Sequence, residues 1–450
     1  MTNLPFGPAE RLAALEAMTR QPLDLLVIGG GITGCGLARD AALRGLAVGL
    51  VEKVDFAYGT SSRSSKLVHG GVRYLAYGDV GLVRESAHER KVLGRIAPHL
   101  VHPLPFLFPL FRGDSAAKFR VGFSMFDKLA GSTRQERHRV LKADEIRERA
   151  PALRDPLTGG FEFTEYITDD ARLTLENALS AAGHGALVAN HAAVTSLLVE
   201  DGRLVGAHVR DELDGATRDV RAAVVVNATG PWAEETVGRG RSPAPKHVLL
   251  SKGVHLLFHA DRLPVRDAVA LKSPAGREGF AIRRWSYVYV GTSDVAHEGQ
   301  LEQPVADQAA IKDVLRMTQD CFPSLGLTEA DVVATWAGLR PLIAEEGKSP
   351  RDTSRHDEVW RSPEGPLSIV GGKLTTYPSH GRAGHGARWQ GARQGARRQP
   401  SDGRGAPSRR RAGRTRFRHV PRCHRGHFQR PRSPGRGSRA HHLALRRRGR

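Results

Sequence analysis

The chain has 450 residues, 40% of them hydrophobic, which is enough for two or three domains with sizeable cores. Its net charge of +21 comes from residues 378–450, which contain 22 arginines and one acidic residue, Asp402. Removing these from the totals of 68 basic and 47 acidic residues leaves 46 of each in the first 377 residues, which excludes a strongly basic, nucleic-acid-binding body.

The stretch from Leu23 to Lys53 predicts a buried strand, a glycine-rich turn, a helix and a second strand. Gly29, Gly31 and Gly34 have the dinucleotide-binding spacing: the first allows the tight turn, the second admits a pyrophosphate, and the third lets the helix pack closely. Glu52 ends the second strand. Its carboxylate can accept a hydrogen bond from a ribose hydroxyl, and its negative charge would repel the extra phosphate of NADP. NAD and FAD remain as candidates.

Two later strands are also predicted to end in glycine turns. Residues 222–226 lead into the sequence NATG at 227–230, and a strand near the end of the body delivers Gly371 and Gly372. Thr375 or Thr376 could cap a helix whose positive end would face a flavin ring. Each turn alone is compatible with an ordinary strand end, but three in this order favour FAD, which is gripped along its whole length.

With these motifs the chain resembles the FAD-dependent glycerol-3-phosphate dehydrogenases. The resemblance covers about residues 23–377, and its most specific stretch is GTSSRSSKLVHGGVRYL at 59–75. The sequences NATGPW, GTSDV, AGLRPL and GGKLTTY follow in family order. The resemblance implies an α/β fold with a Rossmann-like FAD-binding domain built from discontinuous segments, and an α+β substrate (cap) domain. It implies FAD-dependent oxidation of sn-glycerol 3-phosphate to dihydroxyacetone phosphate, with electrons passed to quinone.

The resemblance also implies the domain boundaries. We expect an N-terminal extension at 1–20, FAD-binding segments at 21–104, 166–245 and 335–377, a cap or membrane-facing segment at 105–165, a substrate cap at 246–334, and a disordered arginine-rich tail at 378–450.

Catalytic and substrate-binding roles follow from the same resemblance. The implied catalytic residues are His255, Arg340 and Lys373, and the implied substrate site consists of Arg73, Tyr74, His255, Arg340, Arg355 and Lys373. Guanidinium groups suit a phosphomonoester because they bind its oxygens bidentately. A histidine suits removal of the hydroxyl proton, and His69 is the alternative to His255. Lys373 either binds substrate or stabilises reduced flavin.

The resemblance places a larger set of residues around FAD, and no metal site is expected. The implied cofactor residues are Gly29, Gly31, Ile32, Thr33, Gly34, Glu52, Lys53, Thr60, Ser61, Ser62, Ser64, Ser65, Lys66, His69, Gly70, Gly71, Ala228, Thr229, Gly230, Trp232, Gly338, Gly372, Lys373, Leu374 and Thr375.

The stretch from His102 to Gly131 mixes many apolar residues with arginine and lysine. Such a segment is either protein core or a surface for peripheral contact with an anionic bilayer, where a quinone acceptor would lie. No apolar run approaches the roughly 18 residues that span a membrane, and three widely spaced cysteines fit a reducing compartment. We therefore expect a cytoplasmic protein, peripheral on the inner face of the cytoplasmic membrane, with a homodimer as one assembly that the sequence allows.

Residues 378–450 lack lysine and show no helical or strand periodicity. Their composition is typical of G/C-rich coding DNA translated out of frame, so we hypothesise a frameshift near Tyr377; a genuine RNA-binding tail is the alternative. Family members continue with a helix where this chain has Pro378. The sequence therefore predicts weak FAD binding or poor folding of this product.

Three other functions remain open from the sequence. One is a flavin oxidase of the same fold acting on an amino acid or hydroxy acid, although Arg73, Arg340, Arg355 and Lys373 supply more cations than one carboxylate needs. A second is a related oxidase that uses O₂. The third is an inactive flavin-like body with an RNA-binding tail.

Overall fold

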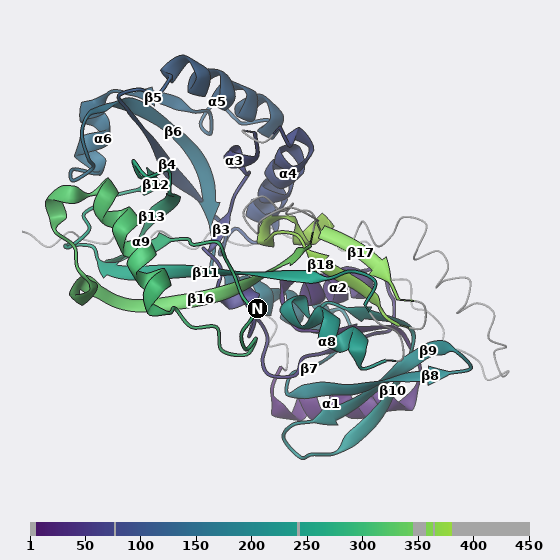
Figure 1. The fold of residues 1–450 in the computed structure, drawn as a ribbon. Helices are drawn as coiled ribbons and strands as arrows, with labels where there is room; N and C mark the ends of the chain where they lie inside the picture. Colours follow the sequence, from purple (N-terminus) through teal and green to yellow (C-terminus); the bar gives the residue numbers. More distant parts are fainter. Residues whose placement is uncertain (1–5, 76–77, 241–243, 345–356, 363–364, 380–450) are drawn as a thin grey trace, which may run out of the picture. The chain divides into compact units, whose positions relative to one another are not determined.

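The protein is described by a computed structural model that covers residues 6–75, 78–240, 244–344, 357–362 and 365–379 (Figure 1). The basic tail, with the frameshift and RNA-binding hypotheses attached to it, lies outside these residues from position 380 onward, so both hypotheses stay predictions. Within the described part, the strands form two sheets.

The first sheet has the order β17-β18-β10-β1-β2-β7, with β8 and β9 attached to β10. Its strands are β1 (Leu23–Ile28), β2 (Val48–Val51), β7 (Leu187–Ala189), β8 (Ala192–Glu200), β9 (Arg203–Asp211), β10 (Thr217–Asn227), β17 (Asp357–Arg361) and β18 (Leu367–Gly371). Pairing is parallel from β18 through β10, β1 and β2 to β7. The carboxyl ends of these strands therefore meet at one edge.

Helices cover both faces of this sheet. Leu25 and Val27 of β1 pack in one core with α2 (Ile32–Leu43) and α7 (Asp170–Gly183). Leu26 and Ile28 pack in another core with α1 (Pro8–Arg20). Because both faces of β1 are covered, an uninterrupted apolar run is the sequence that suits it.

The second sheet has the order β15-β11-β14-β13-β12-β4-β6-β3, with β16 on β11 and β5 on β6. Its strands are β3 (Leu67–Val68), β4 (His102–Phe111), β5 (Arg139–Leu141), β6 (Leu157–Ile167), β11 (Val248–His259), β12 (Ala268–Lys272), β13 (Glu278–Arg284), β14 (Tyr287–Gly291), β15 (Val295–Ala296) and β16 (Val332–Ile343). Because β4 pairs with β12, segments 102–167 and 248–343 build one sheet together.

The remaining helices lie in the connections between the strands of both sheets. These are α3 (Val72–Leu75), α4 (Val80–Ile96), α5 (Ala116–Ala130), α6 (Ala143–Arg149), α8 (Ala233–Gly238) and α9 (Gln308–Cys321), with short 3₁₀ turns η1 (Thr60–Ser62), η2 (Gly230–Trp232), η3 (Pro323–Leu325), η4 (Glu329–Asp331) and η5 (Leu374–Thr376). The long pair of β11 and β16 extends from this sheet until β16 contacts β18 and η2 of the first (Figure 1).

Most apolar residues of the 102–131 stretch are core residues. Phe106 and Phe123 belong to the same buried cluster as Phe161 and Phe163, and Phe126 is 1% exposed. Alternation along β4 and the helical spacing on α5 turn these rings toward one another.

The backbone at residues 377–379 is helical, although Pro378 was expected to interrupt the helix found here in family members. Tyr377 has helical backbone angles (φ −54°, ψ −30°). Proline is tolerated in the first turn of a helix because the N–H it lacks would have no intrahelical partner there. Tyr377 is 3% exposed, and its hydroxyl pairs with Asn177. The proline therefore does not remove the start of this helix.

The close packing of α2 on the β1 turn gives a first prediction. A Cβ at Gly34 would lie 1.9 Å from the carbonyl oxygen of Gly29, so Gly34→Ala should lower the free energy of unfolding by about 1–3 kcal/mol or more. Urea denaturation measures the change. Gly122→Ala is the control, because a Cβ there meets nothing within 4 Å and alanine favours helix α5. Equal stability of the two variants would contradict the packing argument.

Candidate cofactor and substrate site

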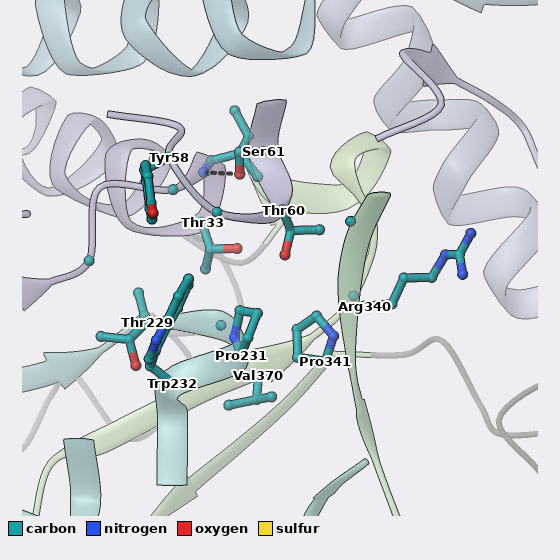
Figure 2. A pocket seen from close by; sticks show the side chains of 18 of the residues that line it. Thr33, Tyr58, Thr60, Ser61, Thr229, Pro231, Trp232, Arg340, Pro341 and Val370 are labelled. Carbon is teal, nitrogen blue, oxygen red and sulfur yellow. Dashed lines mark hydrogen bonds between the residues drawn. The ribbon is translucent and has the colours of Figure 1, made fainter. Parts of the chain in front are cut away.

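A large pocket lies at the edge where the parallel strands of the first sheet end. Its wall comes from the β1–α2 turn, the loop around η1, the β10–η2 turn, β16 and the β18–η5 turn (Figure 2). The pocket is lined by these predicted cofactor residues: Gly29, Gly31, Ile32, Thr33, Glu52, Lys53, Thr60, Ser61, Ser64, Ser65, His69, Ala228, Thr229, Gly230, Trp232, Gly338, Gly372, Lys373, Leu374 and Thr375. The three glycine turns thus open into one pocket.

The β1–α2 turn has the shape of a phosphate cradle. Gly29 has φ +108°, and a Cβ on it would lie 2.7 Å from the carbonyl oxygen of Ala228. Gly31 is the N-cap of α2 and provides no side chain to cap the helix. Ser61 accepts a hydrogen bond from the Ile32 N–H at 2.9 Å. Bare backbone at the positive end of a helix fits a pyrophosphate.

Glu52 holds the same turn in place. Its Oε2 accepts the Gly30 N–H at 2.7 Å and its Oε1 accepts the Val54 N–H at 2.8 Å. Burial raises the pKa of the Glu52 carboxyl. Each carboxylate oxygen can accept more than one hydrogen bond, so binding of a ribose hydroxyl is compatible with both backbone contacts.

His255 lies on β11 in the pocket wall and is 1% exposed. Its ring stacks on Trp336 at 4.6 Å with an interplanar angle of 8°, and its Nε2 lies 2.8 Å from Ser65 Oγ. Its Nδ1 has no hydrogen-bond partner among the described residues. Burial, with the charges of Arg340 and Lys66, lowers the pKa of His255 to about 3. The imidazole is therefore neutral at physiological pH.

A buried carboxylate positions the loop that carries Ser65. Asp170 accepts hydrogen bonds from the Ser64 hydroxyl and from Lys66 Nζ, both at 2.6 Å. The Tyr289 hydroxyl donates to the Ser65 carbonyl oxygen at 3.0 Å. These contacts hold the Ser65 hydroxyl at His255.

Arg340 and Lys373 line the pocket and are both held by neighbours. Arg340 Nη1 lies 2.8 Å from Asp294 Oδ1, and Nη2 donates to Thr292 Oγ1 at 2.6 Å. Lys373 Nζ donates to Ser86 Oγ at 3.0 Å. Both cations are therefore oriented by the protein itself.

Some predicted residues do not line the pocket. These are Gly34, Ser62, Lys66, Gly70 and Gly71. Several of them support the wall from behind: Lys66 binds Asp170, and the Gly70 N–H donates to Glu165 at 2.7 Å. Arg73 and Tyr74 lie on α3, where the structure describes their backbone only. Arg355 falls outside the described residues.

The sequence did not single out other residues of the site. Tyr58, Arg63, Pro341 and Val370 line the pocket, and Asp170 supports it. Asp170 could have been suspected because it begins a helix, but its contact with a loop 106 residues earlier has no local signal. Among the described residues, no group of three or more histidine, cysteine, aspartate or glutamate side chains is arranged to hold a metal.

Burial of neutral His255 predicts a pH dependence of stability. Its pKa is about 3 in the folded chain and about 6.5 when unfolded, so the unfolded state binds one more proton between these values. This stability is complete above about pH 6.5 and is lost as the pH falls toward 3. We expect His255→Gln to flatten the fall in unfolding free energy by up to about 1.4 kcal/mol per pH unit between pH 6 and 5.

The measurement is urea denaturation of wild type and His255→Gln at pH 5, 6 and 7. His184→Gln is the control, because this histidine is exposed at the end of α7. Identical pH slopes for wild type and His255→Gln would contradict the assignment of a buried neutral ring.

Known proteins resemble this chain over most of the described body. The family model for FAD dependent oxidoreductase matches residues 24–361. The aerobic glycerol-3-phosphate dehydrogenase of Bacillus subtilis is 43% identical over 380 residues, which cover 84% of this chain and 68% of that protein. The protein of the same name from Staphylococcus saprophyticus is 41% identical over 79% of this chain and 65% of its own length.

A solved structure gives the same result. The crystal structure of the glycerol-3-phosphate dehydrogenase from Bacillus halodurans complexed with FAD has a TM-score of 0.70 and 37% identity, covering 87% of this chain and 68% of that one. The chain thus spans about two thirds of the length of the relatives it matches.

Proposed function

Because the chain belongs to the FAD-dependent oxidoreductase family, and within it to the aerobic glycerol-3-phosphate dehydrogenases, we propose that it oxidises sn-glycerol 3-phosphate to dihydroxyacetone phosphate with FAD. The family, the α/β fold and the FAD cofactor predicted from the sequence are confirmed. The observation that carries the proposal is the convergence of three glycine turns on one pocket that His255, Arg340 and Lys373 also line.

FAD, when bound, supplies the acceptor for the hydride that leaves C2 of the substrate. The residues of this chain bind the cofactor and the small anion. The pyrophosphate would lie against the backbone of Gly29, Gly31 and the start of α2. The Glu52 carboxylate would accept a hydrogen bond from a ribose hydroxyl. Arg340 and Lys373 provide positive charge for the phosphate of the substrate.

The hydroxyl proton goes to His255 in this proposal. The ring is neutral and can accept a proton, but burial, together with the charges of Arg340 and Lys66, lowers its pKa to about 3, which makes it a weak base. A phosphate with nearly two negative charges beside these cations would oppose their part of this shift and raise the pKa of His255. His69, which also lines the pocket, is the alternative proton acceptor.

The direct test is reduction of the bound flavin by substrate. We expect the purified chain to carry FAD and to reduce a dye when sn-glycerol 3-phosphate is added. His255→Asn keeps a polar side chain that cannot take up the proton, so it should lower kcat about a hundredfold or more while flavin content is unchanged. Steady-state dye reduction and the visible flavin spectrum provide the two readouts.

Arg340→Lys is the companion variant, since it keeps the charge and loses the planar fork, and it should raise KM for the phosphate substrate. Full turnover by His255→Asn would move the proton step to another group, with His69 first in line. Flavin reduction by an amino acid or hydroxy acid, and none by glycerol 3-phosphate, would overturn the proposed substrate.

The electron acceptor is proposed to be a quinone reached by peripheral contact with the cytoplasmic membrane. Among the described residues, no helix is long and apolar enough to cross a membrane. Val121 and Met125 are 69% and 42% exposed on α5, which also exposes Lys118, Arg120 and Lys128. An apolar strip bordered by cations suits an anionic bilayer. The homodimer and the choice between quinone and O₂ stay predictions.

Membrane contact through α5 predicts weaker vesicle binding when the strip becomes acidic. We expect Val121→Glu with Met125→Glu to reduce co-sedimentation with phosphatidylglycerol vesicles about tenfold, because the apolar insertion is lost. The assay is run at raised salt, because salt screens the electrostatic attraction of the basic residues 378–450 for the same vesicles. Leu213→Glu, at a 64% exposed position between β9 and β10, is the control. Unchanged binding of the double variant would contradict contact through α5.

A further inference from the structure

Glu302 lies in the connection between β15 and α9, and four side chains of the pocket wall donate hydrogen bonds to it. Its Oε1 accepts the Trp232 Nε1–H at 3.0 Å and faces Lys53 Nζ at 3.3 Å. Its backbone oxygen accepts the Tyr58 hydroxyl at 3.0 Å and Arg63 Nη1 at 3.4 Å. All four donors line the cofactor pocket.

The four donors form a cluster of their own around the pocket. Lys53 Nζ lies 5.4 Å from the Trp232 ring centre, and the Arg63 guanidinium lies 5.1 Å from that of Tyr58. The Tyr58 and Trp232 rings are 6.5 Å apart. In Figure 2 these two rings lie at the end of the pocket away from Arg340. Glu302 therefore contacts Tyr58 and Trp232 at the end of the pocket that lies away from Arg340.

The loop that carries Glu302 is anchored at both of its ends. The His297 N–H donates to the Leu250 carbonyl oxygen at 2.9 Å on one side. On the other side Asp307 pairs with Lys252 and caps α9 through the Ala310 N–H at 2.8 Å. Both anchors attach the loop to β11 and α9, and between them Glu302 contacts the residues of the cofactor pocket.

The Glu302 contacts are strong enough to form at neutral pH and exposed enough to break reversibly. The hydrogen bond from Trp232, with the charge of Lys53, holds the pKa of Glu302 below its usual range, so the carboxylate stays charged at neutral pH. The Glu302 side chain is 47% exposed and that of Lys53 is 39% exposed. Water and salt therefore weaken the pair without abolishing it.

We propose that Glu302 is a latch for the cofactor: it fastens the 297–307 loop of the cap to Lys53, Tyr58, Arg63 and Trp232 and thereby slows release of FAD. The inference rests on the proposed binding of FAD in this pocket and adds to it a residue that governs how long the cofactor stays. It makes Glu302 a positioning residue, because its carboxylate acts through the pocket wall.

The test is the rate at which the holoenzyme releases FAD, followed by the fluorescence of free flavin after dilution. Glu302→Ala loses both carboxylate contacts, and we expect about tenfold faster release with KM for glycerol 3-phosphate unchanged. Glu302→Gln keeps an acceptor for Trp232 and loses the ion pair, so its release rate should be intermediate and less sensitive to salt than that of wild type.

Glu298→Ala is the matched control, because it removes an exposed carboxylate from the same loop. Trp232→Phe removes the indole N–H. Its effect on the release rate should not add to that of Glu302→Ala, because both variants lose the same hydrogen bond between Trp232 and Glu302. Release from Glu302→Ala at the wild-type rate would overturn the latch. Wild type that holds no FAD would instead overturn the proposed function, so the two failures are distinguishable.

Discussion

Parallel pairing of β1 with β10, and of β10 with β18, determines where the site forms. Ile28 lies opposite Asn227, and Asn227 lies opposite Ser368, so the residues that follow each strand emerge at one edge of the sheet. Three glycine turns far apart in the sequence meet there for this reason alone. A slip in either register would separate the turns and leave no continuous surface for a cofactor as long as FAD.

Buried carboxylates fix the loops beside this edge, because strand pairing does not position them. Asp170 binds the Ser64–Lys66 loop, and Glu165 binds the Gly70 N–H together with Arg90, which is fully buried. Removing one partner of such a group is costly, because the remaining charge stays buried. The site therefore combines backbone at the cofactor with side chains whose own positions are fixed by other charges.

The β1–α2 cradle could be expected from the sequence because its signals are local. Gly29, Gly31 and Glu52 belong to one βαβ unit, and their spacing expresses its geometry. The contacts of Ser65 with His255 and of Glu302 with Trp232 join residues 190 and 70 positions apart, and no periodicity encodes them. At Pro378 the expectation rested on the bias of the residue before a proline away from helix, but Tyr377 has helical backbone angles. Weak FAD binding and poor folding stay predictions.

The charges around His255 also bear on specificity. Burial, together with the charges of Arg340 and Lys66, lowers the basicity of the ring, so on the proposed function His255 is a poor proton acceptor before substrate binds. A substrate that brings a phosphate supplies negative charge that offsets the two cations and raises this basicity, whereas an uncharged polyol binds beside cations that still oppose protonation. Recognition of the phosphate and activation of the base would then be one electrostatic event, so the site could discriminate against neutral alcohols in the chemical step as well as in binding.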